Sequence, residues 1–363
     1  MNESNMWKET DEEILQQIPE KLLTWYDKNA RVLPWRENPQ PYRVWVSEIM
    51  LQQTRVEAVK PYFERFLKAL PTVEDLAQAP EEQLLKLWEG LGYYNRVRNL
   101  QRGARAVMAE HGGVIPASFE ALKKLPGIGD YTAGAIGSIA FQIPVPAVDG
   151  NVLRVISRVL YRRDNILDAK VKRRIEGEIK EILPERTGDF NQSLMELGAT
   201  VCLPNGAPKC NECPLQELCR AHLVGDEESL PVKTKAKTRK IEKRTVFLLV
   251  CDGKIALRKR PEKGLLAGLW ELPSQEGMLG CAEAGKLLQT WGVRTLGELQ
   301  KQTDAKHIFS HVEWHMTCWY VEAELDPDAD VKELIWVSRK ELDQDVALPA
   351  AFKTYRKVIE KIL

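Results

Sequence analysis

One stretch, residues 125–151, restricts the possible folds of this chain more than any other segment. It reads LPGIGDYTAGAIGSIAFQIPVPAVDGN. The Pro and Gly residues at its start predict a hairpin turn, and the small residues that follow predict a closely packed helix over about 131–141. A proline-bounded turn then brings Asp149 to the start of another helix. The segment therefore predicts a helical domain that presents one carboxylate at a helix start.

The hairpin turn indicates contact with a nucleic-acid backbone. Glycines 127 and 129 allow backbone N–H groups to approach a phosphate, and the next helix N-terminus adds partial positive charge. Such contacts position a duplex without reading its sequence. A GxG pair alone fits an ordinary tight turn, but LPGIG followed by a helix of small residues has the form of a helix-hairpin-helix motif. Leu125, Gly127 and Gly129 are therefore candidate DNA-contacting residues.

Apolar residues at helical spacing predict that residues 1–225 form a mainly α domain, with no convincing alternating strand before about residue 240. Thr54 and Glu57 form the pattern of a capping box that opens one helix. The other expected helices cover residues 14–25, 80–88, 95–110, 118–124, 151–161, 169–182 and 189–201.

The composition changes after residue 225. Residues 226–241 are rich in Lys and Arg, which favours a solvated linker, with phosphate contact as the second interpretation. β-Branched and aromatic residues then predict strands, and two helical stretches accompany them. We assign residues 242–363 to a smaller α+β domain, with strands expected at 245–251, 254–258 and 314–321 and helices at 282–291 and 348–363.

Charge totals are uninformative here, because Lys plus Arg and Asp plus Glu both number 52. The cysteines are more informative: four of the seven lie in one short loop, at positions 202, 210, 213 and 219. Four thiolates suit either tetrahedral zinc or a [4Fe–4S] cluster, and the spacing alone leaves both open. The polar N-terminus lacks a signal-peptide core, and no apolar run approaches membrane-spanning length. We therefore expect a soluble, intracellular protein with no membrane partner.

Two carboxylates have settings that suit acid–base chemistry. Glu48 lies among apolar neighbours in VWVSEIMLQQ, where burial would raise its pKa and suit a general acid. Asp149 precedes a helix, whose dipole favours the ionised form. One protonated and one ionised carboxylate are what cleavage of a glycosidic bond needs. Taken singly, Asp149 also fits a plain N-cap and Glu48 a half-buried surface acid.

Together these features resemble the endonuclease-III-like helix-hairpin-helix DNA glycosylases, and most closely the MutY-type adenine glycosylases. The resemblance covers nearly the whole chain. It implies a two-lobed helical domain with the active cleft between its lobes, followed by a MutT-like (Nudix) domain. The matching segments are LPWR at 33–36, VWVSEIMLQQTRV at 44–56, WEGLGYYNRVRNL at 88–100, LPGIGDYTAGAI, PAVDGNV, the cysteine loop and FSHVEWHM at 309–316.

The resemblance implies that the protein extrudes adenine mispaired with 8-oxoguanine or guanine and removes it hydrolytically. Glu48 would protonate adenine N7 and Asp149 would stabilise the oxocarbenium-like sugar, with Asn151 orienting Asp149 and Tyr131 beside the pair. Lyase relatives carry a catalytic lysine where this chain has Tyr131, so we expect a monofunctional glycosylase. The implied adenine pocket consists of Arg31, Leu33, Trp35, Arg36 and Gln192, although Leu33 and Trp35 also fit plain core packing.

The resemblance also implies residues that read the strand opposite adenine. Gln53, Thr54, Leu91 and Tyr93 match these positions, and Tyr93 would insert into the duplex. An ordinary surface aromatic is the alternative for Tyr93. In the second domain, the matching residues are Phe309, Ser310 and His311, and the hydroxyl of Ser310 can donate to or accept from 8-oxoguanine.

The family's cofactor is a [4Fe–4S] cluster, held here by Cys202, Cys210, Cys213 and Cys219. This chain has seven residues between the first two cysteines, where the family usually has six. The resemblance further implies a monomer that binds double-stranded DNA in a bacterial-type cytoplasm, associated with the nucleoid through DNA.

Three other functions are consistent with parts of the sequence. A relative acting on thymine opposite guanine would share the fold, but the second-domain reader and Gln192 argue against it. A non-catalytic damage sensor would not need both Glu48 and Asp149. A nucleotide hydrolase would need the paired glutamates of the Nudix helix, and AEAGKLLQTW offers only Glu283.

Overall fold

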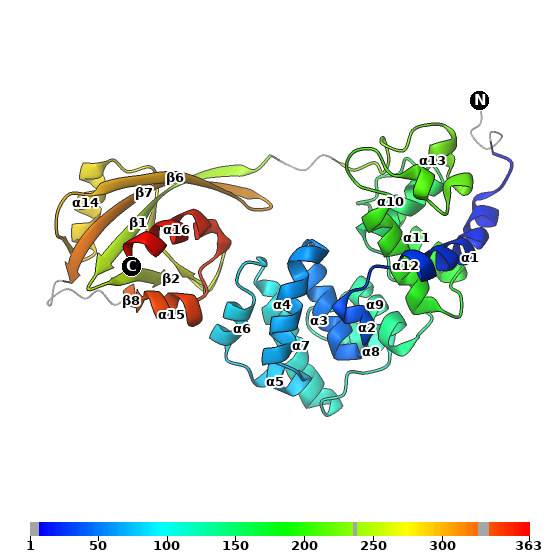
Figure 1. The fold of residues 1–363 in the computed structure, drawn as a ribbon, viewed down its shortest axis with the longest axis horizontal. Helices are drawn as coiled ribbons and strands as arrows, with labels where there is room; N and C mark the ends of the chain where they lie inside the picture. Colours follow the sequence, from blue (N-terminus) through cyan, green and yellow to red (C-terminus); the bar gives the residue numbers. More distant parts are fainter. Residues whose placement is uncertain (1–6, 235–237, 326–333) are drawn as a thin grey trace. The chain divides into compact units, whose positions relative to one another are not determined.

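The computed structural model describes residues 7–234, 238–325 and 334–363, and the chain divides into two compact units (Figure 1). The first unit comprises Met1–Ala79 and Arg98–Lys235, and the second comprises Pro80–Val97 and Ala236–Leu363. Within the described ranges, no helix is both long and apolar enough to cross a membrane.

The first unit is helical, as predicted. It is built from α1 (Asp11–Asn29), α2 (Pro34–Glu37), α3 (Pro41–Leu51), α4 (Val56–Ala69), α5 (Val73–Gln78), most of α7 (Asn95–His111), α8 (Phe119–Lys124), α9 (Asp130–Phe141), α10 (Gly150–Val159), α11 (Ala169–Glu181), α12 (Thr187–Thr200) and α13 (Arg220–Leu223). Two 3-10 turns, Cys210–Glu212 and Gln216–Leu218, lie in the cysteine loop. Each helix predicted in this unit is present, with ends shifted by a few residues.

The small residues of α9 allow it to pack closely against both α3 and α12. A Cβ atom at Gly134 would lie 2.2 Å from the carbonyl oxygen of Pro146, and one at Gly188 would lie 2.7 Å from that of Ser138. Neither position has room for a side chain. This close packing explains why the 131–141 helix is rich in Gly, Ala and Ser, and it brings the starts of α9 and α10 near α3.

The capping box predicted at Thr54 and Glu57 is wrong. Helix α4 begins at Val56 with Arg55 as its N-cap, and no side chain caps it. The Thr54 hydroxyl instead donates to the carbonyl oxygen of Gln52 at 3.4 Å. Gln53 has a left-handed backbone with φ of 57°, so the chain turns sharply before α4 and the capping geometry cannot form.

Over its described residues, the second unit is built around an eight-stranded mixed sheet. Its long central strands, β1 (Lys240–Cys251) and β7 (Val312–Leu325), run parallel, with Val246 opposite Cys318. Apolar side chains of β1 alternate between the two faces, one covered by α14 (Cys281–Thr290) and the other by α15 (Arg339–Gln344) and α16 (Lys353–Ile362). The remaining strands are β2 (Lys254–Lys259), β3 (Trp270–Glu271), β4 (Ser274–Glu276), β5 (Val293–Thr295), β6 (Gln300–Ile308) and β8 (Leu334–Ser338).

Strand β6 was not predicted, because its side chains are mostly polar and exposed and show no alternation. It forms through backbone pairing with β7, interrupted by a bulge between Gln302 and Ala305. Helix α16 begins later than the predicted residue 348, because a 3-10 turn over Ala350–Phe352 follows Pro349.

Helix α6 (Glu81–Leu87) belongs to the second unit, although the segments before and after it in sequence belong to the first. Residues 80–97 contain this helix and the loop that leads into α7. This segment packs with the C-terminal part of the chain, as its ion pairs described below show.

Candidate active site

A cleft of about 1060 Å³ opens in the first unit. It is lined by residues from two distant parts of the chain, 31–57 and 131–199. All nine of the predicted catalytic and adenine-pocket residues line it: Arg31, Leu33, Trp35, Arg36, Glu48, Tyr131, Asp149, Asn151 and Gln192. The tertiary structure therefore brings together the residues that the sequence predicted for chemistry.

Glu48 projects from α3 into this cleft and is only 6% exposed. The hydroxyl of Tyr131, at the start of α9, donates a hydrogen bond of 2.6 Å to Glu48 Oε2. The same hydroxyl lies 3.2 Å from the sulfur of Met195. Tyr131 thus lies beside the acid and fixes the orientation of its carboxyl group.

Burial, together with a smaller contribution from the nearby charge of Asp149, raises the pKa of Glu48 to about 7. The hydrogen bond from Tyr131 and the charge of Arg36 act in the opposite direction. At neutral pH the group can therefore hold a proton and also release it, as a general acid must.

Asp149 is the N-cap of α10 and accepts three hydrogen bonds. Its Oδ1 accepts from the backbone N–H groups of Asn151 and Val152, both at 2.8 Å, and its Oδ2 accepts from Asn151 Nδ2 at 2.7 Å. The predicted N-cap and its catalytic interpretation are therefore compatible, because the cap fixes the carboxylate at the cleft wall.

Burial nevertheless raises the pKa of Asp149, whereas the hydrogen bonds from Val152 and Asn151 lower it. The sequence analysis considered only the helix dipole, which favours the ionised form, and burial acts against it. The three N–H donors stabilise the charged form, and burial opposes them. A positive charge that develops on a bound substrate would lower the pKa of Asp149 and so favour its ionised form.

Arg154 is a buried residue that the sequence analysis missed, and it holds the side-chain amide of Asn151. Its Nη2 donates to Asn151 Oδ1 at 2.8 Å and to the carbonyl oxygen of Gly198 at 2.7 Å. Its Nε donates to the carbonyl oxygen of Cys202 at 2.9 Å. These bonds orient the Asn151 amide so that its nitrogen faces Asp149.

Glu196 is the second missed residue, and it holds two of the predicted pocket arginines. Its carboxylate, which has no exposed side-chain surface, accepts from Arg31 Nε at 2.6 Å and from Arg36 Nη2 at 2.8 Å. The paired arginines lower the pKa of Glu196 against the effect of its burial. Leu33 and Trp35 line the cleft but are 2% and 6% exposed, and Trp35 stacks edge-on against Phe63, so both are also core residues.

Two family models match the chain. Residues 46–181 match the HhH-GPD superfamily of base excision DNA repair proteins, and residues 245–358 match the NUDIX domain. The chain is 36% identical to the adenine DNA glycosylase of Rattus norvegicus, over 94% of this chain and 77% of that protein. It is 34% identical to the adenine DNA glycosylase of Schizosaccharomyces pombe, over 95% of this chain and 90% of that protein. The chain belongs to the adenine DNA glycosylase family.

The helical part of this adenine DNA glycosylase family member also resembles a solved DNA glycosylase structure in fold. The structure of a thermostable thymine-DNA glycosylase matches with a TM-score of 0.53 and 29% identity, over 59% of this chain and 97% of that one. The predicted resemblance, the helical domain followed by a Nudix-like domain and the class of enzyme, a hydrolase of N-glycosyl bonds, are thus confirmed.

Residues 125–129 form the glycine-containing turn before a helix that the sequence predicted. Gly127 has φ of +80°, and a Cβ there would lie 2.6 Å from Asn99 Cβ. Gly129 is the N-cap of α9 and has open space around it. Both glycines are exposed, whereas the Leu125 side chain is 3% exposed and anchors the turn in the core. Any DNA contact at Leu125 would have to use its backbone.

Of the predicted opposite-strand residues, Gln53 and Thr54 line the cleft, and Leu91 and Tyr93 lie in the second unit. Tyr93 is 49% exposed on a left-handed backbone with φ of 48°. Leu91 is 8% exposed, and its carbonyl oxygen accepts from Arg96 Nη2 at 3.0 Å. Tyr93 is therefore presented to solvent, whereas Leu91 supports the loop from within.

Phe309, Ser310 and His311 form the turn between β6 and β7. Phe309 N donates to the carbonyl oxygen of Val312 at 2.8 Å and closes the turn. Ser310 and His311 are exposed, whereas the ring of Phe309 packs against those of His307 and Trp314, at centroid distances of 4.6 and 4.9 Å. Ser310 thus stands at the tip of a hairpin with a fixed base.

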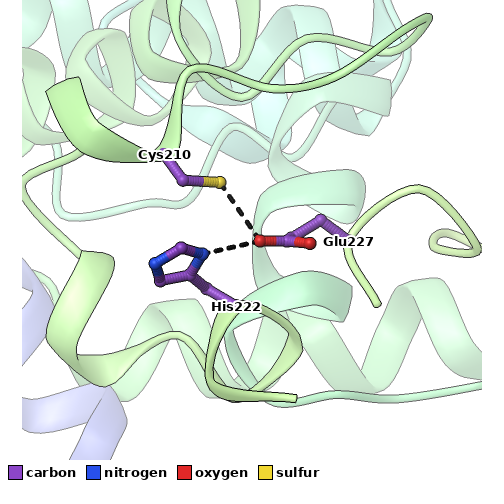
Figure 2. Close-up of side chains that lie close together, drawn as sticks. All are labelled: Cys210, His222 and Glu227. Carbon is purple, nitrogen blue, oxygen red and sulfur yellow. Dashed lines mark hydrogen bonds and ion pairs between the residues drawn. The ribbon is translucent and has the colours of Figure 1, made fainter. Parts of the chain in front are cut away.

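The four cysteines predicted to bind a metal line one small cavity in the first unit. None forms a disulfide, and Arg158 Nη1 donates to the sulfur of Cys202 at 3.2 Å. Figure 2 shows an additional pair that the sequence analysis missed: Glu227 Oε1 lies 2.6 Å from His222 Nδ1 and 3.4 Å from Cys210 Sγ. Because four sulfurs and a cationic donor converge here, the donor set fits a thiolate-bound metal or cluster.

Proposed function

We propose that the protein removes adenine mispaired with 8-oxoguanine or guanine in double-stranded DNA, by hydrolysis, leaving an abasic site. The observation that supports this most directly is the pair of carboxylates in one cleft, with Glu48 at a pKa of about 7 and Asp149 held by three N–H donors. This pairing separates an acid role from a charge-stabilising role, as glycosidic cleavage requires.

Glu48 donates a proton to N7 of the extruded adenine, which makes the base a better leaving group. Asp149 stabilises the positive charge that develops on the sugar, and water then completes the hydrolysis. Tyr131 holds the Glu48 carboxyl in place through its 2.6 Å hydrogen bond. A phenol cannot form a Schiff base with an abasic sugar, so the proposed enzyme has no lyase step at this position.

The extruded adenine enters between the Arg31–Glu196–Arg36 cluster and Gln192. Glu196 is charged and already paired, so it offers acceptor oxygens without an uncompensated buried charge. The exposed glycines of the hairpin bind the backbone of the same DNA, and Tyr93 and Ser310 contact the opposite strand.

We further propose that Cys202, Cys210, Cys213 and Cys219 hold a [4Fe–4S] cluster. The seven-residue first spacing is accommodated by an exposed loop, in which Lys209 N donates to the carbonyl oxygen of Val201 at 3.0 Å. When bound, the cluster would crosslink this loop. A brown purified protein with broad visible absorbance and four irons per chain would agree with this assignment. A colourless protein that contains zinc would contradict it.

A strand-cleavage assay tests the proposed function. Duplexes carrying A opposite 8-oxoguanine, A opposite guanine and T opposite guanine are incubated with the protein and then treated with alkali. Cleavage only at adenine is expected, together with at least about a hundredfold loss of excision in Glu48→Gln, a typical general-acid contribution. Cleavage at thymine would show a different substrate, and full activity in Glu48→Gln would remove its role as the acid.

A borohydride-trapping experiment with abasic DNA tests the absence of a lyase step. No trapped protein–DNA adduct is expected. Efficient trapping that depends on a residue of this cleft would contradict a monofunctional enzyme.

A further inference from the structure

Side-chain hydrogen bonds and ring contacts hold the loop that presents Tyr93. Trp88 Nε1 donates to the carbonyl oxygen of Gly92 at 3.1 Å, and Arg96 Nη2 donates to the same oxygen at 3.1 Å. The Arg96 guanidinium also lies over the rings of Trp88 and Tyr93, at 5.3 and 5.7 Å. Tyr93 is therefore an exposed aromatic side chain on a loop in which the neighbouring Gly92 carbonyl oxygen accepts two side-chain hydrogen bonds.

Two charged residues at the end of α6 fix this loop to the C-terminal part of the second unit. Lys86 Nζ donates to the carbonyl oxygens of Leu342 and Val346, at 3.0 and 2.9 Å, and so satisfies acceptors at the end of α15. Glu89 pairs with Lys86 at 2.8 Å and accepts from the backbone N–H of Leu348 at 3.0 Å. We call Lys86 and Glu89 the loop anchor.

The loop anchor is largely shielded from water. Arg356 Nη1 lies 2.5 Å from Glu89 Oε1, and Arg356 also contacts Asp343 at 3.0 Å. The Lys86 and Glu89 side chains are 17% and 16% exposed. Ion pairs of this kind are screened less by salt than exposed ones, and hydrogen bonds to backbone groups give them a single geometry.

We propose that Lys86 and Glu89 are positioning residues that join the Tyr93 loop to the domain carrying Ser310. Through this connection, Tyr93 and Ser310 engage the opposite strand as parts of one rigid body. This inference rests on the proposed function, because it concerns recognition of the strand opposite adenine. Tyr93 lies four residues after Glu89 in sequence, and only the short, fixed loop separates them.

Hydrogen–deuterium exchange of the free full-length protein tests the anchor without any DNA. In Glu89→Gln and Arg356→Met, the amides of residues 88–97 are expected to exchange about tenfold faster, as expected when a charge-assisted hydrogen bond is lost. The amides of β7 should be unchanged, which separates local release from global destabilisation. Glu324→Gln is the matched control, because it removes an exposed pair with Arg294 at 3.6 Å in the same unit. Unchanged exchange over 88–97 in both variants would overturn the proposal.

A double-mutant cycle tests the consequence for recognition. Affinity is measured for a duplex with a non-hydrolysable adenosine analogue opposite 8-oxoguanine, using Tyr93→Ala, Ser310→Ala and the double variant. The two effects are expected to be non-additive in the wild type and to approach additivity in the Glu89→Gln background. Equal coupling in both backgrounds would contradict the proposal. If the wild type excises adenine from neither the 8-oxoguanine nor the guanine mispair, the proposed function fails, while the exchange experiment still tests the anchor.

Discussion

At the scale of single residues, the chemistry depends on a carboxyl group that is costly to bury. Glu48 is 6% exposed, and its pKa rises from an ordinary 4.5 to about 7 because burial penalises the charged form. Between these two values the folded protein binds more protons than the unfolded chain. Stability contributed by the protonated group is therefore present at low pH and decreases as the pH rises toward 7.

Glu48→Gln should accordingly stabilise the protein at alkaline pH while lowering excision at least about a hundredfold. The expected gain in the free energy of unfolding is about 2–3 kcal/mol at pH 8, and close to none at pH 4.5. Urea unfolding at both pH values measures it. A destabilised variant at pH 8 would show that the Glu48 carboxylate is better solvated than its burial indicates.

At the scale of elements, two glycines that look equivalent in sequence have different structural roles. Gly127 has a left-handed backbone and no space for a Cβ, whereas Gly129 has φ of −96° and open surroundings. Only the first therefore has to be glycine for the hairpin to fold. The second can keep its fold with alanine and lose only the close approach of backbone to phosphate.

Gly127→Ala should lower the free energy of unfolding by about 1–3 kcal/mol, because it adds backbone strain and a clash with Asn99. Gly129→Ala is the matched variant and should change stability by less than about 0.5 kcal/mol while weakening binding to undamaged duplex. Thermal unfolding and fluorescence anisotropy separate the two effects. Equal destabilisation by both substitutions would contradict this distinction.

At the scale of the whole molecule, the second unit matches the NUDIX domain and contains the single glutamate of the AEAGKLLQTW segment. Glu283 of α14 accepts a hydrogen bond from Gly280 N at 2.9 Å and caps its own helix. The exposed turn at Ser310 and the exposed Tyr93 belong to this unit, whereas the carboxylates lie in the other. The two carboxylates and the exposed residues Tyr93 and Ser310 are thus in different units of one chain.

Ser310→Ala should therefore reduce the preference for 8-oxoguanine over guanine without changing excision of adenine opposite guanine. The loss of one hydrogen bond corresponds to roughly a three- to tenfold smaller ratio of the two affinities. Binding titrations with the two duplexes measure this ratio. An unchanged ratio would assign lesion reading to other residues, with Tyr93 as the next to test.

The sequence by itself determined the features that depend on near neighbours. The glycine hairpin, the helix of small residues, the acid at the next helix start and the thiol loop each follow from a short pattern, and together they identified the family. The domain boundaries near 225 and 242 stay predictions, since residues 80–97 associate with the second unit.

Only the tertiary structure decided which distant groups meet. Glu196 lies more than 150 positions from Arg31 and Arg36, and Arg154 reaches the carbonyl oxygen of Cys202, 48 positions away. A buried charge has no local pattern of its own, because its partners come from whichever elements pack against it. The loop anchor could not be predicted from the sequence for the same reason, because Lys86 and Glu89 bind residues more than 250 positions later.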